Sequence, residues 1–100
     1  MTLTEDGIIL DADASLQLML GYDGEGLRGC HFESILTRAS SIFLHLQFQA
    51  RMKLDGKIEN MHLILRKADG GSIPCLLHAH VRERNGAFVH ACSLTTAEAI

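Results

Sequence analysis

The stretch LTEDGIILDADASLQLMLGYDGEGLRGCHF, from Leu3 to Phe32, decides the fold class. It opens on two short β-prone runs, Thr2–Thr4 and Ile8–Ala12, which are joined across Glu5-Asp6-Gly7. Asp-Gly is a strong hairpin signal, because glycine accepts a positive φ. The chain is therefore expected to begin with a β-hairpin.

A short amphipathic helix is expected after the hairpin. Asp13 stands at its N-cap, where a carboxylate can accept a free backbone N–H. The apolar residues recur three and four positions apart, at Leu16, Met19 and Leu20. Gly21 ends the helix in the left-handed position that follows many helices. Asp23–Gly29 carries three glycines and is expected to be a turn with at most a short helix.

The longest helical candidate runs from Thr37 to Leu54, with Ser40 or Thr37 as its cap and Gly56 after its end. Its main apolar face is predicted to consist of Ile42, Phe43, Leu46, Ala50 and Leu54. A second stripe, formed by Leu44, Phe48 and Met52, indicates cover on more than one side. Another helical turn is expected just before it, at Phe32, Ile35 and Leu36.

After Gly56 the hydrophobic period changes from 3.6 to 2, which is typical of half-buried strands. Three strands are predicted, at Lys57–Lys67, Ser72–Arg84 and Ala87–Leu94. Asp69-Gly70-Gly71 and Asn85-Gly86 supply the turns between them. Two strands, then helices, then a three-stranded meander give an α+β fold.

Composition limits the class of protein. One hundred residues make a single domain, 1–100, and a net charge of −3 leaves no electrostatic footprint for nucleic acid or anionic lipid. Three distant cysteines without a C-x-x-C motif favour free thiols in a reducing compartment. No apolar run approaches the roughly 20 residues of a membrane span, so a cytoplasmic location is expected.

The order of these elements resembles a PAS domain, the sensory module of bacterial signal-transduction proteins. TEDGIILDADAS matches the first hairpin of that family, and Leu20-Gly21-Tyr22 matches its L-G-Y helix end. LRGCHFESIL fills the place of the L-x-G-x-x-F-x-x-L turn, and RKADGGSIP matches a common hairpin of the family. Gly26 departs from the usual acidic helix former, and Gly71 is an extra turn residue that would add a bulge. The resemblance implies a five-stranded antiparallel sheet, in the order 2-1-5-4-3, with helices packed on one face.

Ligand sites in this family lie between the helices and the inner face of the sheet. The pocket candidates are residues of the inward rows of the third and fourth predicted strands together with three apolar helix residues. They are Leu20, Phe43, Leu46, Met61, Leu63, Leu65, Cys75, Leu77 and Ala79. The alternative is that these side chains fill the space completely, since protein interiors pack close to crystal density.

The opposite rows carry apolar residues beside imidazoles, at His62, Ile64, Leu76, His78 and His80. This pattern predicts an outer sheet face that another segment or chain covers. The resemblance implies a homodimer through this face or through an N-terminal helix. Imidazoles on adjacent strands can converge on zinc, but two histidines two apart on a strand are more often half-exposed polar residues, so no metal site is predicted at His62, His78 and His80.

Two cofactors are considered and disfavoured. His45 lies on the long helix, where haem-binding members of the family use a histidine, but other signs of a porphyrin pocket are few. Cys30 follows Gly29 directly, whereas the blue-light members place their reactive cysteine in G-R-N-C-R-F, so a flavin thiol is not expected.

No nucleophile elbow or phosphate loop is present, so the domain itself is predicted not to be an enzyme. The resemblance implies a sensor that binds a small ligand or relays a conformational change to a C-terminal effector. That effector would be a histidine kinase, a diguanylate cyclase or a phosphatase within a longer signalling protein. The alternative is a ligand-free dimerisation module with a filled core.

Overall fold

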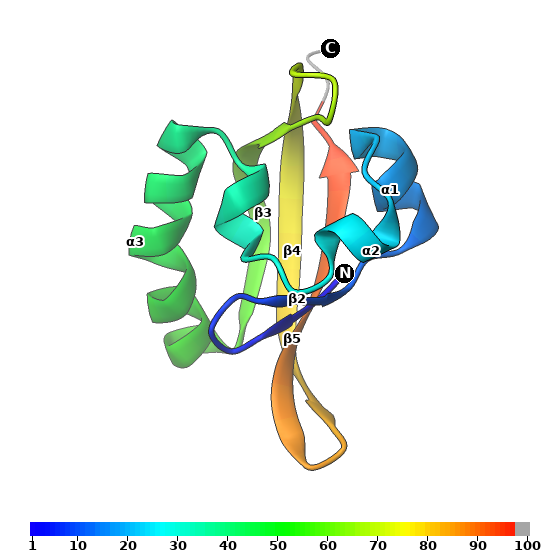
Figure 1. Ribbon diagram of the computed structural model, residues 1–100. Helices are drawn as coiled ribbons and strands as arrows, with labels where there is room; N and C mark the ends of the chain where they lie inside the picture. The colour runs from blue at the N-terminus through cyan, green and yellow to red at the C-terminus, as the bar shows by residue number, and fades with distance from the viewer. Residues whose placement is uncertain (98–100) are drawn as a thin grey trace.

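The computed structural model describes residues 1–97, in which five strands form one antiparallel sheet (Figure 1). The strand order is β2-β1-β5-β4-β3, with β1 between β2 and β5. The strands are β1 (Thr2–Thr4), β2 (Ile9–Asp11), β3 (Lys57–Arg66), β4 (Ser72–Arg84) and β5 (Ala87–Thr96). The predicted fold class and the predicted strand order 2-1-5-4-3 are confirmed.

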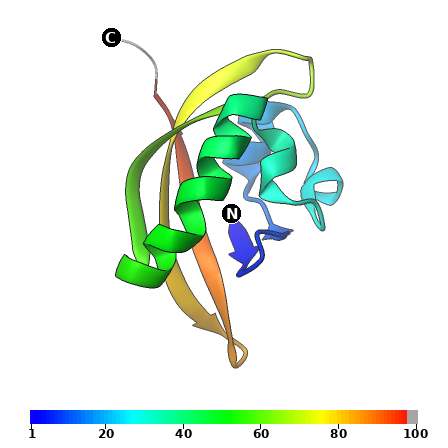
Figure 2. The same cartoon turned by 90° about the vertical axis from the view of Figure 1, so that its left-hand side faces the viewer.

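The helices follow β2 and precede β3 in the chain, and they cover one face of the sheet (Figure 2). They are α1 (Ala14–Leu20), α2 (Gly24–Leu27), the 3-10 helix η1 (Phe32–Ile35) and α3 (Arg38–Asp55). The core lies between this helical layer and the inner face of the sheet, and its largest fully buried side chain is Phe32.

The ends of the helices follow the sequence signals in all but one place. Gly21 and Gly56 both adopt the left-handed conformation, with φ of 83° and 69°. Thr37 caps α3, and its side chain accepts a hydrogen bond from the Ser40 backbone N–H. Asp13 occupies the N-cap position of α1, but its carboxylate accepts a hydrogen bond from the Ser15 hydroxyl instead of from a backbone N–H.

The prediction for the core-facing side of α3 is wrong. Leu44, Phe48 and Met52 are buried, whereas the five residues predicted to form the main face are exposed and are called the outer stripe here: Ile42, Phe43, Leu46, Ala50 and Leu54. Two polar contacts to Ile64 of β3 fix the rotation of the helix. The Thr37 N–H donates to the Ile64 carbonyl at 2.9 Å, and the Ser40 hydroxyl accepts from the Ile64 N–H at 2.8 Å. Ser40 is therefore held against the sheet, and the stripe in line with it faces the core.

The pairing of β3 with β4 contains one irregularity, which lies between Ile58 and Met61. Asn60 has a φ of 56° there, so the alternation shifts by one residue and Ile58 and Met61 are both buried. The register between Arg66 and Ser72 is regular, so the bulge expected from Gly71 is not found at that turn.

The β4–β5 hairpin extends beyond the rest of the sheet (Figure 1). Arg84, near its tip, donates a hydrogen bond to the Asp11 carboxylate at 2.9 Å and so ties the hairpin to β2. Burial acts to raise the pKa of Asp11, but the hydrogen bond from Arg84, helped by Thr2 and the N-terminal ammonium group, lowers that pKa overall.

Among residues 1–97, none of the helices combines the length and the apolar character that crossing a membrane would require.

Candidate functional site: a pocket beside helix α3

The β1–β2 turn forms one wall of a surface pocket. The Gly7 N–H donates to the Thr4 carbonyl at 2.9 Å, and the Phe32 N–H donates to the Gly7 carbonyl at 2.8 Å. Gly7 has a φ of 89°, and a Cβ atom at this position would lie 2.7 Å from Nε2 of His31. Glycine is therefore required here both for the backbone conformation and for the close approach of the imidazole.

Both ring nitrogens of His31 make hydrogen bonds to the backbone. Its Nδ1 lies 3.1 Å from the Glu33 backbone N–H, which can only donate, so Nδ1 accepts. Nε2 must then carry the proton, and it donates to the Asp6 carbonyl oxygen at 2.8 Å. This hydrogen bond connects the β1–β2 turn to the start of η1.

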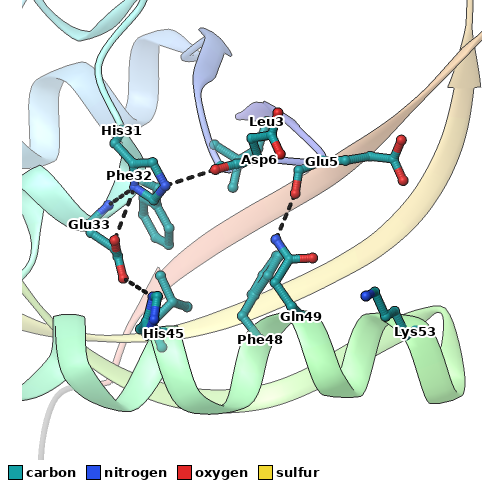
Figure 3. Close-up of a pocket in the computed structure, with 12 residues that line it drawn as sticks. Leu3, Glu5, Asp6, His31, Phe32, Glu33, His45, Phe48, Gln49 and Lys53 are labelled. Atoms are coloured by element: carbon teal, nitrogen blue, oxygen red, sulfur yellow. Dashed lines mark hydrogen bonds and ion pairs between the residues drawn. The ribbon is translucent and has the colours of Figure 1, made fainter.

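The Glu33 carboxylate lies between two imidazoles. Its Oε2 is 3.5 Å from Nδ1 of His31, and its Oε1 is 3.4 Å from Nδ1 of His45 on α3. The contact with His45 is an ion pair only when that imidazole is protonated. Glu33 thus connects His31, the residue before η1, to His45 on α3, as Figure 3 shows.

Helix α3 supplies the opposite rim and part of the floor. His45, Gln49 and Lys53 are four residues apart, so they lie along one side of the helix. The Gln49 side-chain N–H donates to the Glu5 carbonyl at 2.6 Å, across the mouth of the pocket (Figure 3). Beneath this rim lie four apolar side chains, Leu3, Phe32, Leu44 and Phe48. The pocket has a volume of about 610 Å³.

His90 lies directly behind the floor of the pocket. It pairs with Leu3 across β1 and β5, and its ring centroid is 5.3 Å from that of Phe48. The side chain is only 4% exposed, and Nδ1 finds no hydrogen-bond partner among residues 1–97. Burial lowers the pKa of His90, although the Glu5 carboxylate opposes the shift.

The lining of the pocket has the mixed polarity that is typical of small-molecule sites. A compact apolar floor is surrounded by an ammonium group, a carboxamide, a carboxylate and imidazoles, which can orient a bound molecule. Among the described residues, no group of three or more His, Cys, Asp or Glu side chains is arranged to hold a metal ion. The three cysteines are free: Cys75 and Cys92 are buried, which raises the pKa of both thiols, that of Cys92 to about 12.

The ligand-pocket candidates chosen from the sequence do not line this pocket. Seven of them are buried in the core, at Leu20, Met61, Leu63, Leu65, Cys75, Leu77 and Ala79. The other two, Phe43 and Leu46, belong to the outer stripe, so placing them at the inner face of the sheet is wrong. His45, which the sequence suggests only as a disfavoured haem ligand, lies at the rim of the pocket.

The five interface candidates lie on β3 and β4. His62, Ile64 and His80 are exposed, and Leu76 and His78 are half-buried. The alternation along the strands therefore predicted correctly that these five positions do not belong to the buried row. A homodimer through this face stays a prediction.

Sequence reasoning missed Gln49, Lys53 and the pair His31 and Glu33. The last two follow Gly29-Cys30 in a segment without periodicity, so no local pattern distinguishes them. The Asp-Gly turn was recognised, but its contact with a histidine 25 residues away is visible only in the fold.

Solved structures of PAS domains match nearly the whole chain. The PAS-B domain of Cycle from Drosophila melanogaster, solved with bound ethylene glycol, has a TM-score of 0.77 and 14% identity, covering 94% of this chain and 96% of that one. A PAS domain from Desulfitobacterium hafniense has a TM-score of 0.76 and 19% identity, with coverage of 96% and 89%. A PAS domain of a two-component sensor histidine kinase has a TM-score of 0.79 and 12% identity, with coverage of 95% and 80%.

The chain therefore folds as a PAS domain, the class of small sensory modules that its sequence resembles. No family model matches it. Among curated proteins, the phosphoserine phosphatase RsbP of Bacillus subtilis (strain 168) is 35% identical over 94 residues, which are 94% of this chain. The chain spans only 23% of the length of that phosphatase.

Proposed function

We propose that this chain is a regulatory sensor domain whose input site is the pocket between the β1–β2 turn, the His31–Glu33 segment and α3. The observation that carries this proposal is the combination of an apolar floor with a polar rim in about 610 Å³. Small-molecule sites have volumes of roughly 300–1,000 Å³ and this same composition. The ligand is expected to be a small molecule with one apolar part and one hydrogen-bonding part.

The signal would leave the pocket through α3. Gln49 ties this helix to the β1–β2 turn, so a ligand that competes for its amide or contacts Lys53 changes that link. At its other end, α3 is attached to Ile64 of β3 through the Ser40 hydroxyl. A ligand shifts the equilibrium between two arrangements only by its difference in affinity for them.

The effector would be a catalytic domain of a longer signalling protein, of which residues 1–100 form one domain. The similarity to a phosphoserine phosphatase over 94 residues favours a phosphatase over a histidine kinase or a diguanylate cyclase. The domain itself then supplies regulation and no catalysis. Three free cysteines are consistent with a reducing, cytoplasmic compartment.

The proposal is tested by native mass spectrometry of the freshly purified chain, followed by a thermal-shift screen with small metabolites. A bound mass, or a compound that raises the melting temperature, is the expected result. Lys53→Ala should weaken the binding of that compound about tenfold, because a charge-assisted hydrogen bond is lost. Arg51→Ala is the control, since Arg51 is exposed on the same helix but does not line the pocket.

A second candidate is a ligand-free dimerisation module. It is favoured by the seven pocket candidates that are packed into the core, of which four are 0% exposed: Leu20, Leu65, Cys75 and Leu77. A bare mass together with no thermal shift across the screen would support this module and contradict the sensor.

A further inference from the structure

The outer stripe of α3 is an apolar surface without cover in the described chain. Ile42 is 53% exposed, Phe43 42%, Leu46 67% and Leu54 83%. The small residues Ala39 and Ala50 lie exposed among them. The helix thus buries one apolar stripe against the sheet and presents a second to solvent, along an axis of roughly 27 Å for 18 residues. A contiguous apolar patch of this kind marks an interaction site.

We propose that α3 is a self-association surface, on which two copies of this chain pair through their outer stripes with their helices antiparallel. A two-fold interface requires that residue i meets residue j and that j meets i. When the two-fold axis passes between Leu46 and Gln47, position 43 of one copy faces position 50 of the other. Position 39 then faces position 54.

The sizes of the side chains fit this register. Phe43 of one copy packs on Ala50 of the other, and Leu54 packs on Ala39, so each large residue meets a small one. Leu46 lies beside the two-fold axis, next to Leu46 of the other copy. Ridges of residues four apart, such as Ile42, Leu46 and Ala50, are the surface that interdigitates when helices pack.

The charges fit the same register. Arg38 begins the helix, where a cation faces the positive end of the helix dipole, and α3 has no acidic residue before Asp55. Antiparallel pairing places Arg38 beside the C-terminal end of the other helix, where Asp55 and the last carbonyls favour a cation. Within residues 1–97 neither Arg38 nor Asp55 makes an ion pair in its own chain.

Sedimentation equilibrium of the full chain tests the proposal. The wild-type chain should show a monomer–dimer equilibrium, and Leu46→Glu should weaken dimerisation at least about tenfold, because two carboxylates would meet at the axis. Leu18→Glu is the matched control: Leu18 is 85% exposed but lies on α1, so its variant should dimerise as the wild type does. Both side chains are exposed, and circular dichroism confirms that both variants fold.

Exchanging Phe43 and Ala50 tests the register itself. Phe43→Ala and Ala50→Phe should each weaken the dimer, and the double variant should recover most of the lost affinity because the large and small partners have only changed sides. A double variant at least as weak as the weaker single overturns the antiparallel register. A monomeric wild-type chain, or a dimer that resists Leu46→Glu but is lost in Leu76→Glu on the sheet, overturns the proposal.

Discussion

His90 couples the stability of the domain to pH at the level of a single residue. Its imidazole is buried behind the pocket, and burial lowers its pKa from the ordinary value of 6.5. The unfolded chain therefore binds a proton at a higher pH than the native chain does. The contribution of His90 to the free energy of unfolding is fully present above about pH 6.5 and is lost as the pH decreases below that value.

Replacing His90 should remove this dependence. Between pH 7.5 and pH 5.5, the wild-type chain should lose stability more steeply than His90→Leu, by at most about 1.4 kcal/mol per pH unit. Urea unfolding of both chains at several pH values measures the difference, and the other five histidines cancel because both chains contain them. Equal slopes would contradict a neutral, buried His90.

Gly7 shows how a residue-level constraint shapes an element, the β1–β2 turn. Gly7 and Gly70 both have a positive φ, of 89° and 93°, but only Gly7 faces an atom that a Cβ would strike, Nε2 of His31. Gly7→Ala should therefore cost about 1–2 kcal/mol more in unfolding free energy than Gly70→Ala, through the displaced His31–Asp6 hydrogen bond. Denaturant unfolding of the two variants checks this, and equal costs would show that His31 adapts freely.

At the level of elements, sequence patterns were sufficient where a single periodicity was present. The alternation along β4 separated buried Cys75 and Leu77 from half-buried Leu76 and His78. On β3 the same alternation failed to show the irregularity near Asn60, because no local signal distinguishes a bulge from a regular strand.

Helix α3 illustrates the opposite case, because it carries two apolar stripes. The helical pattern predicts the stripe with more large residues as the core face, whereas polar contacts of Thr37 and Ser40 with Ile64 select the other stripe. Those contacts join residues 24 and 27 positions apart and have no signature in the helical pattern. A second apolar stripe on an 18-residue helix is therefore a signal for an interaction surface as much as for the core.

At the level of the whole molecule, the fold separates two surfaces. The helical layer holds the pocket and the outer stripe, and within residues 1–97 no helix covers the other face of the sheet (Figure 2). Ile64 is exposed and Leu76 is half-buried. The candidate site could not be predicted from sequence, since its walls come from the β1–β2 turn, the His31–Glu33 segment and α3, which meet only in the folded chain. The fold could be predicted, because its strands and turns follow local patterns.

Regulation of an effector through the pocket can be measured in a chimera. The matching region of the phosphatase RsbP, 35% identical over 94 residues, is replaced by this chain, and phosphoserine hydrolysis is measured. The chimera should be folded and active, and Lys53→Ala should change its activity while Arg51→Ala should not. Identical hydrolysis by the chimera, by both variants and by a phosphatase lacking the region would contradict regulation through the pocket.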